Sequence, residues 1–223
     1  LGDTFDIHGG GVDLRFPHHE NEIAQSRAAG LGFANYWLHN AWVTMGGEKM
    51  SKSLGNSLRV SEVVKEHRPL AVRYYLTAAH YRSTIEFHPG SIEESGTAVQ
   101  RIEGFLRRAL PGVTTAVPAG DEALPDDFRE AMDDDLGVSG ALAVIHEAVT
   151  TGNTALDDGD PEDAAAIARV VIAMTDVLGV NPLDPAWSAG DSGATDALAS
   201  LDALVKERIA ARLQHGQLEV LRG

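Results

Sequence analysis

FDIHGGGVDLRFPHHENEIAQS, residues 5–26, is the stretch that decides the fold of the first part of this chain. Phe5 and Ile7 alternate with polar residues and three glycines follow, which predicts a short strand ending in a tight loop. Pro17 then begins a predicted helix and Gly30 ends it, at the positions where helices favour these two residues. The stretch therefore predicts a strand, a glycine loop and a helix in succession.

The rest of the chain extends this pattern and then becomes helical. Residues 38–45 predict a second strand, Ser61 is expected to cap a helix, and Pro69 begins another. Strand, helix, strand and helices in this order are typical of the later part of an α/β domain. Beyond His88, apolar residues at helical spacing predict a bundle of helices. These helices are expected over residues 91–110, 125–136, 138–153, 161–179 and 195–213.

The charged residues divide the chain into two regions. The net charge is −15, yet residues 1–89 contain nine basic and nine acidic residues, whereas residues 90–223 contain nine and 24. Seven of the nine histidines also lie in the first region, which is where we expect the site. The absence of cysteine excludes disulfides, and no apolar run reaches the about 20 residues of a membrane helix. Because the first methionine is Met45, we expect a piece of a longer chain.

The segment GGEKMSKSLGN, residues 46–56, places two lysines among glycines and small hydroxyl residues. A lysine ammonium suits a phosphate oxygen, and glycines let the backbone approach a ligand closely. Loops of this kind close over a substrate and help to stabilise the charge that develops in the transition state. A solvated surface turn is the alternative for an isolated K-x-x-K, but KMSKS after a Gly-Gly turn is more specific.

Two further motifs are candidates for ligand binding. In HGGGVD, the glycines allow a backbone to pass a nucleotide and Asp13 can accept hydrogen bonds from ribose hydroxyls, although a plain hinge explains three glycines equally simply. In PHHENE, His18 and Glu22 are four residues apart on the predicted helix and face the same way. Imidazole and carboxylate are zinc ligands, but two of them do not complete a tetrahedral site, and a surface pair is the alternative.

Taken together, these motifs resemble cysteinyl-tRNA synthetase, a class I aminoacyl-tRNA synthetase. KMSKS resembles the signature loop of that class, and residues 5–26 together with RYYLTAAHYRSTIEF narrow the resemblance to the cysteine enzyme. The similarity runs from Thr4 to about Leu110, continues more loosely over residues 132–149, and weakens after about Gly179. It implies the second half of a Rossmann-like catalytic domain followed by an all-α bundle.

The resemblance also implies roles for individual residues. Lys49 and Lys52 are expected to be catalytic, with Lys52 on the ATP phosphates, and His8 is expected in the cysteine pocket. The other expected ATP contacts are Gly11, Asp13 and Val43, and the expected zinc ligands are His18 and Glu22, whose cysteine partners lie upstream with the HIGH motif. Zinc has a physical purpose here, because a soft metal separates cysteine from serine by binding its thiolate, whereas an apolar pocket separates near-isosteres poorly.

The implied protein is a cytoplasmic, monomeric cysteine–tRNA ligase that uses ATP with Mg2+, cysteine and tRNA(Cys), without membrane contact. We expect residues 1–68 to complete the catalytic domain, residues 69–180 to support tRNA docking, and residues 181–223 to form part of an anticodon-binding tail. Arg73 and Arg82 are candidates for contact with the acceptor stem. On its own this chain is expected to be inactive, because half of the zinc ligands and the HIGH motif are missing.

Two alternatives remain open at this stage. The cysteine ligase of mycothiol biosynthesis shares the HGGG, PHHE and KMSKS elements, but it transfers cysteine to glucosaminyl-inositol. PHHENEIAQS and HYRSTIEF favour the synthetase. A non-catalytic tRNA- or nucleotide-binding module is the second alternative, favoured by the missing HIGH motif and opposed by the presence of both the metal pair and the lysine loop.

Overall fold

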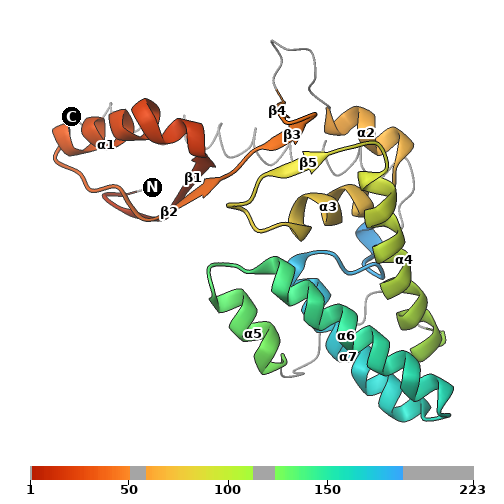
Figure 1. Ribbon diagram of the computed structural model, residues 1–223. Helices are drawn as coiled ribbons and strands as arrows, with labels where there is room; N and C mark the ends of the chain where they lie inside the picture. The colour runs from red at the N-terminus through yellow and green to blue at the C-terminus, as the bar shows by residue number, and fades with distance from the viewer. Residues whose placement is uncertain (1, 51–58, 113–123, 188–223) are drawn as a thin grey trace, which may run out of the picture. The chain divides into compact units, whose positions relative to one another are not determined.

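The computed structural model describes residues 2–50, 59–112 and 124–187 (Figure 1). The chain divides into two compact units. The first comprises Leu1–Val113 and Val117–Pro182 and contains all the strands and α-helices described below. Of the second unit, the described part is a short segment that includes a single 3-10 turn, η3 (Pro185–Trp187). The predicted helix over residues 195–213 lies outside the described residues.

The chain begins with two parallel strands and the helix that connects them. Strand β1 (Phe5–Gly11) pairs with β2 (Ala34–Asn40) in parallel, with Gly10 opposite His39. Two parallel neighbours need a crossover connection, which here contains the turns η1 (Val12–Leu14) and η2 (Arg15–His19) and helix α1 (Glu20–Ala28). The predicted strand and helix are confirmed, but the predicted tight loop at the three glycines is wrong, because all three belong to β1. The α-helix begins after Pro17, at Glu20.

A second, three-stranded sheet carries the start of the lysine segment. It has the order β4-β3-β5, formed by Glu48–Lys49, Val43–Met45 and Ile85–Phe87. Strands β3 and β4 form a hairpin across Gly46 and Gly47, whose positive φ angles of 63° and 77° suit a tight two-residue turn. The single strand predicted over residues 38–45 is therefore wrong: it is interrupted after Asn40, and its two parts belong to different sheets.

Six further helices follow, and most lie where the periodicity placed them. They are α2 (Val60–Glu66), α3 (Pro69–Ala78), α4 (Ser91–Ala109), α5 (Asp126–Asp133), α6 (Val138–Asp157) and α7 (Pro161–Leu178). Pro69 begins α3 as predicted, but the prediction that Ser61 caps α2 is wrong, because the cap residue is Arg59. Among the described residues, no helix has the length and apolar character needed to cross a membrane.

The core of the unit lies between the helices. Helix α3 packs on α4, while α6 packs on α5 and α7 (Figure 1). The largest fully buried side chains come from several of these helices. They include Leu70 of α3, Phe105 of α4, Phe128 of α5, Ile145 of α6 and Met174 of α7. The predicted class, an α/β part followed by a helical bundle, describes this architecture.

Candidate functional site

The candidate metal ligands converge where β1 meets the start of α1. His8 projects from β1, and its Nε2 lies 2.9 Å from Glu22 Oε2. His18 Nε2 lies 3.4 Å from the other carboxylate oxygen of Glu22, four residues along the chain. The structure therefore brings His18 and Glu22 together, as their spacing indicates, and places Glu22 between two imidazoles.

A buried histidine completes a cluster at the same place. His19 is only 3% exposed, and its Nδ1 lies 3.0 Å from His39 Nε2 on β2. Burial, and next the nearby His8, lower the pKa of His19, so its neutral form is favoured. A Cβ on Gly10 would lie 3.0 Å from His19 Nε2, so the middle glycine of HGGGVD leaves room for this ring.

His8, His19 and Glu22 are arranged so that they could hold a metal ion. Each offers a ligand atom, and these three atoms lie within 4.8 Å of one another. Glu22 Oε2 is buried and makes no hydrogen bond with the described residues, although His8 Nε2 is nearby. Two imidazoles and a carboxylate are a donor set that suits zinc. His18, by contrast, has a side chain that is 59% exposed.

Sequence reasoning named His8, His18 and Glu22 but assigned no site role to His19 or His39. The signal for His19 is its place beside His18 in the PHHENE motif. For His39, the signal is its position at the carboxyl end of a strand, where parallel sheets bind ligands. To recognise this position, the bounds of β2 (Ala34–Asn40) must be known, and the sequence predicted a strand only from residue 38.

The residues expected to bind adenosine lie at the end of β1, in the turn after it and at the start of β3. Gly11 is the last residue of β1 and precedes turn η1, which contains Asp13. Asp13 Oδ1 accepts a hydrogen bond of 3.3 Å from the Trp42 indole. Because Val43 follows Trp42 and begins β3, this bond joins the two segments that the resemblance assigns to ATP.

The lysine segment is anchored at its base by Glu86 of β5. Its carboxylate accepts hydrogen bonds from the Thr44 hydroxyl and, at 3.0 Å, from the Gly47 backbone N–H. These two bonds lower the pKa of Glu86, which favours the ionised form that accepts them. Lys49 lies in β4 opposite Thr44, whereas Lys52 lies outside the described residues.

A cavity of about 570 Å3 opens beside the cluster of His8, His19 and Glu22, which we call the histidine cluster. Its walls include His19, Trp37 and His39, and two arginines, Arg15 and Arg82, also line it. The Trp37 and His39 rings are nearly parallel, with an interplanar angle of 13° and centroids 5.8 Å apart. Glu20 lines the same cavity, which therefore combines an aromatic wall with charged side chains of both signs, and its volume is in the usual range for small-ligand sites.

Comparison with known proteins places these features in a family. Residues 1–97 match the model for the class I (C) tRNA synthetase catalytic domain, and residues 127–182 match the DALR domain. The cysteine–tRNA ligase of Leifsonia xyli subsp. xyli is 57% identical over 217 residues, which are 95% of this chain and 45% of that protein. The cysteine–tRNA ligase of Streptomyces avermitilis is 53% identical, covering 95% and 46%. The chain thus spans less than half the length of these curated relatives.

Solved structures support the same fold at low sequence identity. LeuRS of Agrobacterium radiobacter K84, in a ternary complex with tRNA and LeuAMS, superposes with a TM-score of 0.57 at 20% identity. That match covers 82% of this chain and 26% of the LeuRS chain. Methionyl-tRNA synthetase of Mycobacterium tuberculosis, in complex with methionyl-adenylate, gives a TM-score of 0.50 at 19% identity, covering 85% and 43%. Similarity at this level establishes the class I synthetase fold.

Proposed function

The chain belongs to the family of cysteine-specific class I aminoacyl-tRNA synthetases, and on this basis we propose that it is part of a cysteine–tRNA ligase. The complete enzyme joins cysteine to ATP, releases pyrophosphate and transfers the cysteinyl group to tRNA(Cys). The observation that carries the proposal is the cluster that His8, in the middle of β1, and His18 form with the carboxylate of Glu22, at 2.9 and 3.4 Å from its oxygens.

The cluster is proposed to select cysteine with the help of zinc. Glu22 and His18 would hold the ion together with cysteines outside this chain, and His8 would face the cysteine substrate. Glu22 Oε2 supports this assignment, because it is buried with only the imidazole of His8 close by, and a buried carboxylate oxygen is costly unless it is paired or binds a cation. The zinc supplies a thiolate-binding ligand position, which serine fills poorly.

ATP is proposed to bind across the ends of β1 and β3. Gly11 allows close approach of the backbone, Asp13 accepts hydrogen bonds from the ribose, and Val43 lies beside the adenine. Lys49 and Lys52 contact the phosphates together with Mg2+. The bond from Trp42 to Asp13 supports this arrangement because it holds the two adenosine-binding segments against each other.

The remaining assignments concern the partners and the setting of the enzyme. The helices over residues 69–180 are proposed to support tRNA docking, and residues 181–223 to form part of an anticodon-binding tail. The enzyme is proposed to be cytoplasmic and monomeric. Zinc, ATP with Mg2+, cysteine and tRNA(Cys) are then its ligands.

The first experiment is cysteine-dependent ATP–pyrophosphate exchange by the complete protein, followed by a choice of acceptor. We expect exchange with cysteine but not serine, and transfer to tRNA(Cys). Transfer to glucosaminyl-inositol instead would assign the mycothiol-pathway ligase, and absence of exchange would favour a non-catalytic module. The same assay on residues 1–223 alone is expected to show no exchange.

Zinc binding is tested separately from activity. We expect Glu22→Gln to lower the zinc content of the purified complete protein, measured by elemental mass spectrometry. Glu20→Gln is the matched control, because Glu20 begins the same helix and lies outside the three-residue cluster. Equal zinc content in the two variants would refute the assignment of Glu22.

A further inference from the structure

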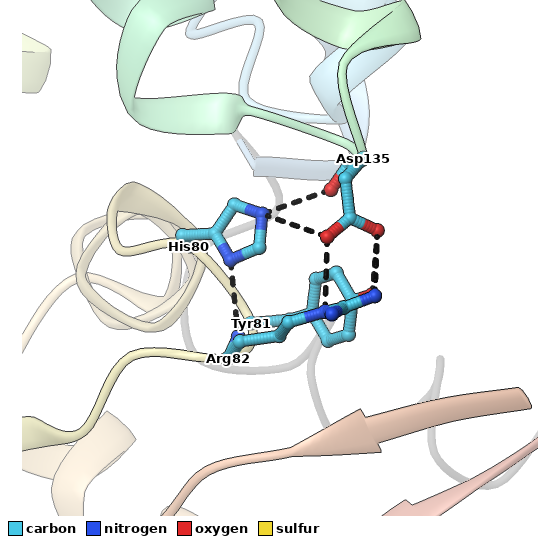
Figure 2. A network of polar contacts seen from close by, with 4 residues as sticks. All are labelled: His80, Tyr81, Arg82 and Asp135. Carbon is cyan, nitrogen blue, oxygen red and sulfur yellow. Dashed lines mark hydrogen bonds and ion pairs between the residues drawn. The ribbon is translucent and has the colours of Figure 1, made fainter.

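Three consecutive side chains between α3 and β5 converge on one carboxylate at the junction of α5 and α6 (Figure 2). The Tyr81 hydroxyl donates to Asp135 Oδ1 at 2.7 Å. Arg82 binds both oxygens of the same carboxylate, with Nε 2.9 Å from Oδ2 and Nη2 3.2 Å from Oδ1. His80 Nε2 lies 2.9 Å from the Asp135 backbone oxygen. We refer to these four residues as the clasp.

The clasp holds a turn of uncommon backbone geometry. Asp135 and Leu136 have φ angles of 55° and 59°, in the left-handed region that residues other than glycine rarely adopt. Such conformations persist where surrounding contacts impose them, and they are enriched at functional sites. The contacts of His80, Tyr81 and Arg82 with Asp135 are of this kind. The turn is therefore fixed by the segment that leads to β5.

Arg82 also belongs to the cavity beside the histidine cluster. It lines this cavity together with Trp37, His39 and Arg15. Its Nε and Nη2 are engaged by Tyr81 and Asp135, while Nη1 makes no hydrogen bond with any residue in the described part of the chain. A guanidinium held along one edge is oriented in advance and keeps donors for a second partner on its other edge.

We propose that Arg82 binds a phosphodiester at the acceptor end of the tRNA, and that Asp135 and Tyr81 are positioning residues that orient its guanidinium. The proposal rests on the function proposed above, because transfer of the cysteinyl group requires the acceptor end to reach the cysteine pocket. The planar guanidinium matches a phosphate group, and the aromatic side chains of Trp37 and His39 line the same cavity.

The ion pair with Asp135 explains why the orientation of the Arg82 guanidinium matters. Asp135 offsets the charge of Arg82, so the pair attracts a polyanion only weakly at long range. Its contribution is a directed, charge-assisted hydrogen bond at close range. Arg73, the other arginine considered for this role, instead donates to the Leu178 backbone oxygen at the end of α7, 3.4 Å away, which gives it a structural contact.

The experiment compares the two half-reactions in the complete protein. We expect Arg82→Gln to lower kcat/KM for charging of tRNA(Cys) about tenfold or more, the effect of one lost charge-assisted hydrogen bond. Cysteine-dependent ATP–pyrophosphate exchange should stay within about twofold of wild type, because that reaction does not involve the tRNA. Equal losses in both reactions, or unchanged charging, would overturn the proposal.

The positioning role has its own test. Asp135→Asn should reduce charging in the same direction as Arg82→Gln, and the double variant should charge no worse than Arg82→Gln alone, because both changes act through one guanidinium. Asp134→Asn is the matched control, an adjacent exposed carboxylate outside the clasp. Additive losses, or a loss in the control equal to that of Asp135→Asn, would refute the role of Asp135. Where Asp135→Asn fails to fold, Tyr81→Phe replaces it.

The two proposals fail in distinguishable ways. If wild-type protein shows no exchange with cysteine, the proposed ligase function fails. If wild-type protein exchanges and charges normally and Arg82→Gln does the same, only the phosphate contact fails.

Discussion

The contact of α4 with α6 at Gly152 provides a quantitative test of the helical packing. A Cβ at this position would lie 2.2 Å from Cζ and 2.4 Å from Cε2 of Phe105, and 3.2 Å from Cγ2 of Ile167. Phe105 is 0% exposed, so its ring can move only by displacing the side chains that enclose it. Gly152→Ala therefore forces the two helices apart or pushes the ring off its rotamer.

The expected effect is the difference between two opposing contributions. Replacing glycine by alanine inside a helix gains about 1 kcal/mol. Overpacking a dense core costs about 1–3 kcal/mol, and an overlap with two ring atoms belongs at the upper end. We therefore expect Gly152→Ala to destabilise the helices by about 2 kcal/mol, the difference between these terms. Gly104→Ala is the matched control in α4, where a Cβ meets no other atom within 4 Å, and it should stabilise.

Amide hydrogen exchange of α4 and α6 in the complete protein measures this effect locally, because it reports the free energy of opening for each helix. Protection should fall in Gly152→Ala and rise slightly in Gly104→Ala. If both variants gain protection equally, helix propensity alone decides the outcome, and the close packing of Phe105 on Gly152 is refuted.

Three further predictions concern pH and catalysis. Burial, and to a smaller extent Arg101, lower the pKa of His146, so on acidification the unfolded state takes up the proton before the folded state. The free energy of unfolding should therefore fall as the pH drops below about 6.5, the ordinary value of the imidazole. In thermal unfolding, His146→Gln should make the stability depend less on pH in this range. Burial opposes ionisation of Glu103, but hydrogen bonds from Arg68 and Arg107 outweigh it and lower the pKa of this carboxyl group. Glu103 should therefore stabilise the folded protein above pH 4.5, and this stabilisation should disappear as the pH falls through the lowered pKa. In an acid titration of unfolding, Glu103→Gln should lack this pH-dependent loss. Lys52→Ala should slow ATP–pyrophosphate exchange by the complete protein about a hundredfold. An exchange rate equal to that of the wild type would exclude a contact of Lys52 with the phosphates in the transition state.

The long helices were predictable because each of them carries one apolar face that is buried. The periodicity places α4, α6 and α7 within a few residues of their observed ends, since burial of that face dominates their stability. The strands were less predictable. A three-residue strand such as β5 is too short to show alternation, and the break after Asn40 arises from pairing with two different sheets. That pairing is tertiary information, which no local pattern contains.

The site shows the same division between local and long-range information. His18 and Glu22 were named because their spacing places them on one face of a predicted helix and because they match two zinc ligands that the resemblance implies. His39 joins His19 only through the parallel register that places Gly10 opposite it, 29 residues along the chain. Asp135 lies just beyond α5, which ends at Asp133. Its contacts with Tyr81 and Arg82 depend on the α3–β5 connection, which sequence spacing does not reveal.

The distribution of charge bears on the proposed contact with tRNA phosphates. In the helical part, arginines of the described residues are engaged with neighbouring protein groups. Arg101 contacts Thr150, Arg107 contacts Glu103, Arg108 contacts Asn153, and Arg129 contacts Asp126. Because affinity for nucleic acids comes mainly from basic side chains on phosphates, acidic helices with engaged arginines are a poor general binder. On the proposed function, directed contacts would then come from the neutral first region, beside the proposed cysteine pocket. The proposed phosphate contact of Arg82, oriented by Asp135 of the helical part, is such a contact.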